Sequence, residues 1–398
     1  MKKLNNNEIK NKKIIFRADL NIPVFKKKIT DYSRLDAIIP SLTKLIQGKN
    51  KIFIIAHYGR PKGKVDNNLS INFLCEQISQ KLKVSKVHFL KSINHEEIKK
   101  KLLEMNEGEV CLLENIRFFK EEENNDFNFS KSLSSNFDIY VNDAFSVSHR
   151  NHSSIVGLPK FLPSYAGLSF TKEIENLNNF LIKAKKPNLA IIGGSKISTK
   201  IQVINNLITL FDTVVIGGAM ANTFLLAKKY NIGTSICEKD FISIANEILI
   251  NAKNKNCKII LPVDVVCSKN LQENPKVFKC DINSVPNDQM VLDIGDKSIN
   301  LIFDEIIKCR SVLWNGPLGA FEYNPFNKSS IDIANQIKKK FKEKTLNALA
   351  GGGDTISVIN LAKTKDGFNY LSNAGGAFLE WLEGNKSPGY ISLETNQF

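Results

Sequence analysis

Short apolar runs alternating with amphipathic helical patterns are the feature that most constrains how this chain can fold. In the first half, the runs are KKIIFRADL, KIFIIAHYG, EVCLLENIRF and FDIYVNDAF. Helices are predicted over 31–47 and 70–82, the second with Ser70 as its N-cap. Near-continuous apolar strands separated by helices are typical of a parallel sheet that helices cover on both faces. This half is therefore predicted to be a doubly wound α/β domain.

The second half repeats the alternation, with the runs NLAIIGGSK, TVVIGGAM, CKIILPVD, SVLWNGPLG, LNALAGGGD and YLSNAGG. Between the halves, residues 171–186 carry Ile174, Leu177 and Leu181 at helical spacing and stop before Pro187, which predicts an interdomain helix. A chain of 398 residues exceeds the usual size of one core. The predicted fold class is therefore α/β, with two mainly parallel, Rossmann-like domains joined by that helix.

Composition excludes several classes of protein. No apolar run is long enough for a membrane span, and the N-terminus lacks the apolar stretch of a signal peptide, so a cytoplasmic protein is expected. The seven cysteines include no CxxC pair, which favours free thiols over disulfides or a zinc site. The net charge of +15 is spread along the chain, so no dedicated nucleic-acid site is expected. The polar stretch 120–126 is expected to be a solvated loop.

Basic and polar side chains follow the predicted strands of the first half. The residues concerned are Asp19, Asn21, Arg34, His57, Arg60, Arg117, His149 and Arg150. Because parallel strands end at one edge of a sheet, these side chains are expected to lie together. Guanidinium groups bind phosphate and carboxylate with two hydrogen bonds, so the cluster predicts a pocket for a compact anion with several oxygens.

In the second half, glycines rather than basic residues follow the predicted strands. They stand at 193–194, 217–218, 316 and 319, 351–353 and 375–376. Glycine at a strand-to-helix turn lets backbone N–H groups approach a phosphate, so the repetition predicts a nucleotide site. Lys196 and Lys200 would supply positive charge there, and Asp354 could hold Mg²⁺. The chain has neither GxxxxGK[ST] nor GxGxxG, which disfavours both a P-loop NTPase and a simple dinucleotide-binding oxidoreductase. A nucleotide-dependent oxidoreductase and a basic nucleic-acid-binding protein remain the alternatives.

The ordered motifs resemble those of the phosphoglycerate kinase family over nearly the whole chain. They are RADLNIP, HYGRP, LLENIRF, VNDAFSVSHRNHSS, GGSKISTK, GGAMANTFL, LPVD, WNGPLGAFE, GGGDT and LEGNKSPG. The resemblance implies a monomeric kinase that transfers a phosphoryl group between 1,3-bisphosphoglycerate with ADP and 3-phosphoglycerate with ATP. It divides the chain into a 3-phosphoglycerate-binding domain (1–170), the interdomain helix (171–186), a nucleotide-binding domain (187–380) and a segment returning to the first domain (381–398).

The resemblance also assigns site residues. The substrate contacts would be Asp19, Asn21, Arg34, His57, Tyr58, Gly59, Arg60, Arg117 and Arg150. The nucleotide contacts would be Lys196, Lys200, Glu322, Gly351, Gly352, Gly353, Asp354 and Thr355, with Asp354 as the Mg²⁺ ligand. Asp296, Asn373 and Ala374 depart from the family pattern but leave these charged groups intact.

A carboxylate acceptor is already ionised at neutral pH, so no general base is expected. Arg34 and Lys196 are the predicted catalytic groups, and closure of the two domains is the expected route to in-line transfer.

Overall fold

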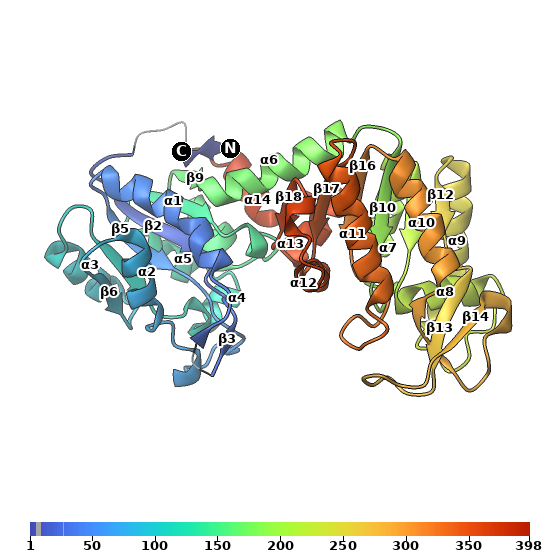
Figure 1. The fold of residues 1–398 in the computed structure, drawn as a ribbon. Coiled ribbons are helices and arrows are strands. Elements are labelled where there is room, and N and C mark those ends of the chain that lie inside the picture. The colour runs from blue at the N-terminus through green and yellow to red at the C-terminus, as the bar shows by residue number, and fades with distance from the viewer. Residues whose placement is uncertain (5–8, 27) are drawn as a thin grey trace. The chain divides into compact units, whose positions relative to one another are not determined.

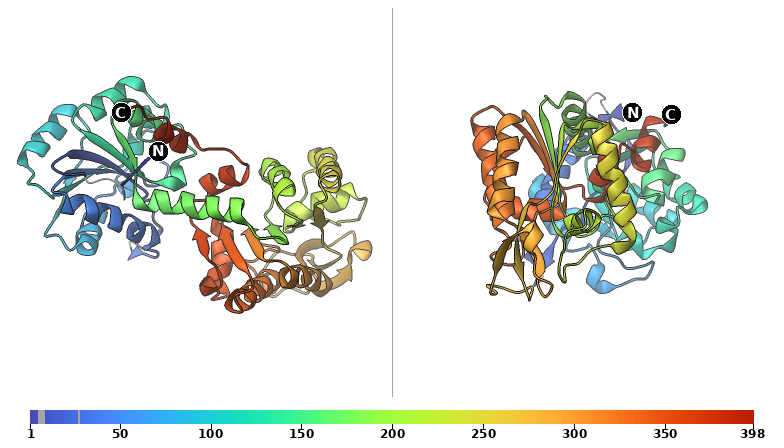
Figure 2. Two further views of the ribbon diagram at one scale, coloured as in Figure 1. Left: turned by 90° about the horizontal axis from the view of Figure 1, so that it is seen from above. Right: turned by 90° about the vertical axis from the view of Figure 1, so that its right-hand side faces the viewer.

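The computed structural model describes residues 1–4, 9–26 and 28–398, which form two compact units. Unit 1 comprises Met1–Glu175 with Lys386–Phe398, and unit 2 comprises Asn176–Asn385. Each unit contains one large parallel sheet with helices on both faces (Figures 1 and 2). The predicted α/β fold class with two Rossmann-like domains is therefore confirmed. Among the described residues, no helix combines the length and apolar character needed to cross a membrane.

The large sheet of unit 1 has the strand order β1-β9-β8-β2-β5-β7-β6, with every pair parallel. Its strands are β1 (Lys2–Lys3), β2 (Lys13–Ala18), β5 (Lys51–Ile55), β6 (Val87–Leu90), β7 (Val110–Leu113), β8 (Ile139–Asp143) and β9 (Ser164–Ala166). A small hairpin pairs β3 (Val24–Phe25) with β4 (Lys28–Ile29). Strands β1, β6 and β9 were not predicted, because each is short and lacks a long apolar run.

Six helices belong to unit 1 alone among the described residues. They are α1 (Ser33–Gln47), α2 (Leu74–Leu82), α3 (His95–Glu104), α4 (Lys120–Glu123), α5 (Phe127–Ser134) and α14 (Pro388–Glu394). Buried residues of α1 and α2, such as Leu42 and Ile78, form one core with Phe16 and Ile54 of the sheet. The alternate strand residues, such as Phe53, point to the opposite face and are also buried.

The prediction that Ser70 caps a helix over 70–82 was wrong. Helix α2 begins at Leu74, because the carboxylate of Glu114 holds the preceding segment outside the helix. That carboxylate accepts hydrogen bonds from Ser70 Oγ (2.7 Å) and from the backbone N–H of Ile71 (3.0 Å).

The large sheet of unit 2 has the order β12-β11-β10-β16-β17-β18, again parallel throughout. Its strands are β10 (Asn188–Ile192), β11 (Thr213–Ile216), β12 (Lys258–Ile260), β16 (Ser311–Asn315), β17 (Asn347–Gly351) and β18 (Tyr370–Ser372). The helices are α7 (Ile201–Leu210), α8 (Ala219–Ala227), α9 (Ile242–Asn254), α10 (Asp296–Lys308), α11 (Lys328–Lys342), α12 (Gly353–Leu361) and α13 (Gly376–Leu382). Trp314, fully buried in β16, packs among residues of α10, α11 and α12.

Unit 2 also contains a three-stranded antiparallel sheet, which was not predicted. It consists of β14 (Phe278–Asp281), β13 (Asp264–Ser268) and β15 (Met290–Ile294), in that order. The run CKIILPVD was interpreted as one strand, but Pro262 separates β12 from β13 within it. Proline cannot donate to a strand ladder, so the chain changes sheet at this point.

Helix α6 (Leu168–Lys183) contains the division between the units, after Glu175. It begins three residues before the predicted range, because two buried side chains in unit 1 satisfy its first N–H groups. Ser41 Oγ accepts from the N–H of Leu168, and Asp143 Oδ1 accepts from that of Phe170, both at 2.9 Å. The helix N-terminus is thereby anchored to α1 and β8.

Candidate functional site: an anion-binding edge and a nucleotide cavity

The polar residues singled out in the first half follow four neighbouring strands of unit 1. In the sheet these strands stand in the order β8, β2, β5, β7, all parallel. Asp19 and Asn21 follow β2, His57 follows β5, Arg117 follows β7 and Arg150 follows β8. Their carboxyl ends share one edge of the sheet, which is where open α/β sheets bind ligands.

Asp19 orients Arg34. Its Oδ1 accepts a hydrogen bond from Arg34 Nη1 at 2.9 Å, and its Oδ2 accepts one from Ser146 Oγ at 2.5 Å. The carboxylate is therefore held from both sides, and it fixes the guanidinium of Arg34 at the start of α1. Ser146 was not predicted, since a serine in a loop carries no distinctive sequence signal.

The backbone of the HYGRP motif is held by side chains from neighbouring loops. Asn21 Oδ1 accepts from the N–H of Gly59 at 3.0 Å, and Arg117 Nη1 donates to the Gly59 carbonyl at 3.0 Å. Asn115 donates to the carbonyl of Tyr58 and accepts from its N–H. Gly59 has φ of 63°, a left-handed conformation that favours glycine. Asn21, Tyr58 and Gly59 thus shape the edge rather than add charge to it.

The charge at this edge comes from arginines, because the nearby histidines are neutral. Burial lowers the pKa of His57 well below its usual value, and the neighbouring arginines lower it further. Burial, followed by Arg150 or Arg117, lowers the pKa of His149 to about 4 and that of His152 to about 3. Arg60 and Arg150 are exposed. Among the described residues, Arg60 makes no hydrogen bond or ion pair, so its guanidinium is available to a ligand.

A buried network of hydrogen-bonded side chains, two of them ionisable, lies next to this edge, and it was not predicted from the sequence. Arg17 in β2 and Glu122 in α4 are 1% and 0% exposed. Arg17 Nε donates to Ser154 Oγ at 2.9 Å, and Ser154 Oγ donates to Glu122 Oε1 at 2.6 Å. The prediction that 120–126 is a solvated loop was wrong, because Ser154 and Arg17 give the middle glutamate of EEE a buried partner network.

In unit 2, the glycine-containing loops follow β11, β10, β16, β17 and β18, which are neighbours in the sheet. Lys200 joins two of these loops. Its Nζ donates to the carbonyl of Gly193 at 2.6 Å and to Oδ1 of Asn315 at 2.7 Å. Burial lowers the pKa of Lys200 to about 8, against a smaller opposing effect of Asp354. Lys196, in the same loop as Gly193, is exposed.

The loops after β16 and β17 are locked together. Thr355 Oγ1 accepts from the N–H of Gly316 at 2.7 Å, and Asn315 Nδ2 donates to the carbonyl of Gly351 at 2.8 Å. Gly316 has φ of 104°, and a Cβ there would lie 2.2 Å from the carbonyl oxygen of Gly193. Only glycine fits such a close approach. By contrast, a Cβ on Gly353 would meet no atom within 4 Å, so space remains beside that residue.

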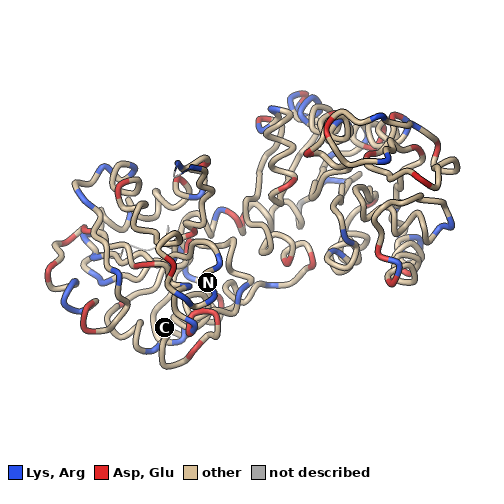
Figure 3. The backbone as a smooth tube through the Cα atoms, turned by 90° about the horizontal axis from the view of Figure 1, so that it is seen from below, with Lys and Arg blue, Asp and Glu red and all other residues tan. Residues whose placement is uncertain are grey.

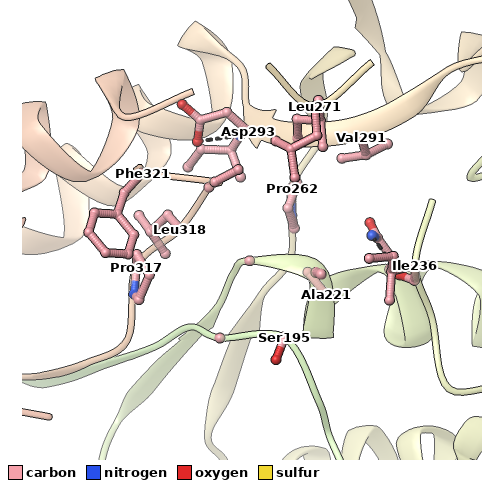
Figure 4. Close-up of a pocket in the computed structure, with 18 of the residues that line it drawn as sticks. Ser195, Ala221, Ile236, Pro262, Leu271, Val291, Asp293, Pro317, Leu318 and Phe321 are labelled. Carbon is pink, nitrogen blue, oxygen red and sulfur yellow. Dashed lines mark hydrogen bonds between the residues drawn. The ribbon is translucent and has the colours of Figure 1, made fainter. Parts of the chain in front are cut away.

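A cavity of about 260 Å³ opens beside these loops. Two of the predicted nucleotide contacts, Glu322 and Asp354, line it together with Gly194 and Gly218. Figure 4 shows its largely apolar wall, in which Pro317, Leu318 and Phe321 lie on one side and Ile236, Leu271 and Val291 on the other. This wall was not predicted, because its residues come from separate segments without a shared motif. A mostly apolar cavity with a few polar groups suits a heterocyclic ligand.

Asp354 has the chemistry of a magnesium ligand. It lies in the first turn of α12, lines the cavity and is exposed. Among the described residues, no hydrogen bond donor occupies its carboxylate. In the same part of the chain, no group of three or more His, Cys, Asp or Glu side chains could hold a metal ion. One carboxylate fits Mg²⁺ bound mainly through nucleotide phosphates, which is how proteins commonly hold it.

The departures from the family pattern fall outside the loop contacts just described. Asp296 begins α10, and its carboxylate accepts from Lys279 Nζ and Lys328 Nζ, each at 3.0 Å. Those two lysines lower its pKa. Ala374 is buried, and its N–H donates to Ser372 Oγ. Asp296 therefore joins β14, α10 and α11 at the surface.

Lys and Arg are interspersed with Asp and Glu along both units, as Figure 3 shows. Even in the lysine-rich end of α11, Lys338 and Lys342 both pair with Asp366. All seven cysteines are free thiols.

Three comparisons with known proteins give the same family over nearly the whole chain. A family profile described as phosphoglycerate kinase matches residues 4–385. A phosphoglycerate kinase of a Chelativorans species is 43% identical over 387 residues, covering 97% of each chain, and one of Brucella abortus is 41% identical over 391 residues, covering 98% of each. The solved phosphoglycerate kinase of Coxiella burnetii matches with a TM-score of 0.88 and 33% identity, covering 98% of each chain. The solved phosphoglycerate kinase of Pyrococcus horikoshii matches with a TM-score of 0.82 and 28% identity, and the match covers 99% of this chain and 98% of the Pyrococcus chain. These matches favour the kinase over the oxidoreductase and nucleic-acid alternatives, and the chain belongs to the phosphoglycerate kinase family.

Proposed function

We propose that unit 1 of this glycolytic kinase binds 3-phosphoglycerate or 1,3-bisphosphoglycerate, and that unit 2 binds ATP or ADP. The observation that carries the proposal is the arginine cluster at the ends of four adjacent strands, set against glycine loops and an apolar cavity in the other unit. Arg60 and Arg150 are exposed, and Arg150 directly follows the neutral His149, so these two arginines are the groups best suited to the anionic substrate. Residues 386–398 belong to unit 1 and hydrogen-bond to Ser148, in the loop that carries Arg150.

The residues fall into two kinds of role. Arg34, His57, Arg60, Arg117 and Arg150 contact the substrate, while Asp19, Asn21, Tyr58 and Gly59 shape its site. Lys196, Glu322, Gly353 and Asp354 contact the nucleotide, while Lys200, Gly351, Gly352 and Thr355 hold its loops.

In the reaction, a carboxylate oxygen of 3-phosphoglycerate forms a bond to the γ-phosphorus of ATP as the bond from that phosphorus to the bridging oxygen breaks. The leaving group is ADP, and no proton moves, since the carboxylate is already ionised. Arg34 and Lys196 supply positive charge around the transferring group, whose equatorial oxygens carry spread negative charge in a loose transition state. Catalysis by this chain is therefore mainly placement and electrostatic stabilisation.

Mg²⁺ bound to the nucleotide would add charge neutralisation on the phosphates, and Asp354 is the residue that would hold it. Because the two substrates are assigned to different units, the units must approach one another in each turnover and exclude water from the transfer. A monomer suffices for this scheme, because each proposed site is built from one chain. The cytoplasm, where glycolysis proceeds, is the proposed compartment.

A coupled assay tests the proposal. Purified protein is mixed with MgATP and 3-phosphoglycerate, and glyceraldehyde-3-phosphate dehydrogenase in excess converts the product with loss of NADH. We expect NADH loss that depends on both substrates and on magnesium. Turnover without magnesium would remove the metal from the scheme, and a rate no higher than that without the enzyme would overturn the proposed reaction.

A further inference from the structure

The ring of His57 is hydrogen-bonded to an arginine that can only donate. Nη2 of Arg17 lies 3.3 Å from Nδ1 of His57. A guanidinium carries N–H donors and no acceptor, so Nδ1 must be the acceptor of this bond. A ring nitrogen that accepts a hydrogen bond carries no proton. His57 is therefore neutral, and its single ring proton is on Nε2.

Arg17 is held in this position by bonds whose direction is also fixed. Its Nε donates to Ser154 Oγ at 2.9 Å, and its Nη1 donates to the carbonyl of Ala18. Ser154 Oγ in turn donates to Oε1 of Glu122 at 2.6 Å, and the N–H of Ser154 donates to Oε2 at 2.8 Å. Because the guanidinium of Arg17 can only donate, Ser154 Oγ accepts from it with a lone pair and uses its one proton to donate to Glu122.

Glu122 is the buried carboxyl on this side of the site: burial raises its pKa, while Arg17 and the two hydrogen bonds from Ser154 oppose that rise. Both Glu122 and Ser154 are 0% exposed, and Arg17 is 1% exposed. A buried guanidinium is costly without a partner network, and here Ser154 links it to that buried carboxyl. The other titratable or charged groups that act on His57 are Arg34, Arg117 and His152, and the two arginines likewise disfavour a protonated ring.

We propose that Arg17, Ser154 and Glu122 are positioning residues that hold His57 as the neutral tautomer protonated on Nε2. His57 then offers the substrate one N–H donor and no charge. This assigns the histidine an orienting role toward a carboxylate or phosphate oxygen, while the arginines supply the attraction. The role toward the substrate rests on the proposed function, whereas the tautomer itself is a property of the substrate-free protein.

The tautomer is measured by long-range ¹H–¹⁵N correlation NMR on the full chain labelled at histidine and free of substrate. The five histidines make assignment feasible, with His57→Gln identifying the signal by its disappearance. We expect an unprotonated Nδ1 and a protonated Nε2 in wild type, unchanged between about pH 5.5 and 8, where an ordinary histidine titrates. A proton on Nδ1, or titration of His57 in this range, would overturn the proposal.

Ser154→Ala removes the link between Arg17 and Glu122. Ser153→Ala is the matched control, since Ser153 is equally buried but donates to the Glu121 carbonyl. We expect Ser154→Ala to place part of the His57 population in the Nδ1-protonated form, while Ser153→Ala keeps the wild-type spectrum. Ser154→Thr, which retains the hydroxyl, should restore the wild-type tautomer. If Ser154→Ala does not fold, Arg17→Lys tests the same link, because an ammonium cannot make the three directed bonds.

Kinetics separate this proposal from the proposed function. Ser154→Ala is expected to raise KM for 3-phosphoglycerate about tenfold, the effect of weakening one hydrogen bond to a charged ligand, with KM for ATP unchanged. Identical tautomers in Ser154→Ala and Ser153→Ala would overturn the positioning role. A shifted tautomer with an unchanged KM for 3-phosphoglycerate would instead remove His57 from the proposed substrate site.

Discussion

Arg34 and Lys200 show how differently two cations at these sites are placed. Arg34 is partly exposed, and its guanidinium is oriented by Asp19. Lys200 directs its ammonium at backbone and side-chain oxygens of two loops. An oriented but accessible cation suits contact with a reacting group, whereas a cation already bound to several oxygens suits the maintenance of a loop.

Replacing Arg34 by alanine should lower kcat by a factor of about 10² or more, because charge aimed at a transition state is lost. Binding of MgATP, measured by calorimetry, should be nearly unchanged. Lys44→Ala, a change later in the same helix, is the control and should retain wild-type kcat. A kcat for Arg34→Ala within tenfold of wild type would remove Arg34 from the catalytic role.

The depressed pKa of Lys200 predicts a pH dependence. A lysine with a pKa of about 8 loses its charge as the pH rises through that value, so kcat/KM for ATP should fall above about pH 8. In Lys200→Met the activity should be lower and this alkaline fall absent. An unchanged alkaline fall in the variant would assign it to another group.

The candidate site residues that the sequence points to are those with a distinctive chemistry at a strand end, such as Arg60 and Asp354. Arg17 could not be predicted, because in an apolar strand an arginine gives no sign of its buried partner. The burial of Glu122 could not be predicted either, because acidic runs such as 121–123 are usually exposed to solvent. Its partner Ser154 lies far away in the sequence and is close to it only in the folded chain. The apolar cavity wall was equally invisible, since Leu271 and Phe321 meet only through the fold.

At the scale of elements, the anchoring of α6 to unit 1 is the contact with the clearest physical consequence. Asp143 is fully buried, and burial raises its pKa to about 7, so much of it is protonated in the folded protein near neutral pH. A Cβ on Gly167 would lie 2.3 Å from Asp143 Oδ1, which leaves no room for a bulkier residue at the start of the helix. The N-terminus of α6 is therefore tightly packed against a titrating group.

Asp143→Asn should change how stability depends on pH. A carboxyl whose folded pKa is raised contributes stability that is present at acid pH and is lost as the pH rises from about 4 to about 7. Asparagine cannot ionise, so the stability of the variant relative to wild type should improve over this range, by a few kcal/mol at most.

Urea unfolding of both proteins at several pH values measures this difference. Asp138→Asn, an exposed change near the start of β8, is the control. A stability difference between wild type and Asp143→Asn that does not vary with pH would show that Asp143 does not titrate in this range.

The elements β2, α1 and β10 could be predicted because their apolar pattern is strong. The antiparallel sheet of β13, β14 and β15 could not be predicted, since Phe278–Asp281 is short, has no apolar run and is mostly exposed. The short edge strand β1 forms only because β9, far away in the sequence, pairs with it. Tertiary pairing, rather than local preference, forms these elements.

At the scale of the whole chain, the last residues belong to the first unit. Ser387 Oγ donates to Ser148 Oγ at 2.9 Å, and the N–H of Gly389 donates to the Ser148 carbonyl at 2.8 Å. Ser148 directly precedes His149 and Arg150. The C-terminal segment thus supports the loop that carries one of the proposed substrate arginines.

Gly389→Val should displace α14 from this loop, because a Cβ at this position would already lie 2.9 Å from Ile155 and 3.0 Å from Ser148. We expect a several-fold higher KM for 3-phosphoglycerate with an unchanged KM for ATP. Lys386→Ala, which removes an ion pair with Glu394 and a cation–π contact with Tyr390 at the surface, is the control and should leave both values unchanged. Equal effects of the two variants would separate the C-terminal segment from the substrate site.

The central claim is that each unit binds one substrate, and isothermal titration calorimetry of two variants tests it most directly. Arg60→Ala should weaken binding of 3-phosphoglycerate about tenfold or more and leave binding of MgADP unchanged. Asp354→Ala should weaken binding of MgADP and leave binding of 3-phosphoglycerate unchanged. If either substitution weakened both ligands equally, the assignment of one substrate to each unit would be contradicted.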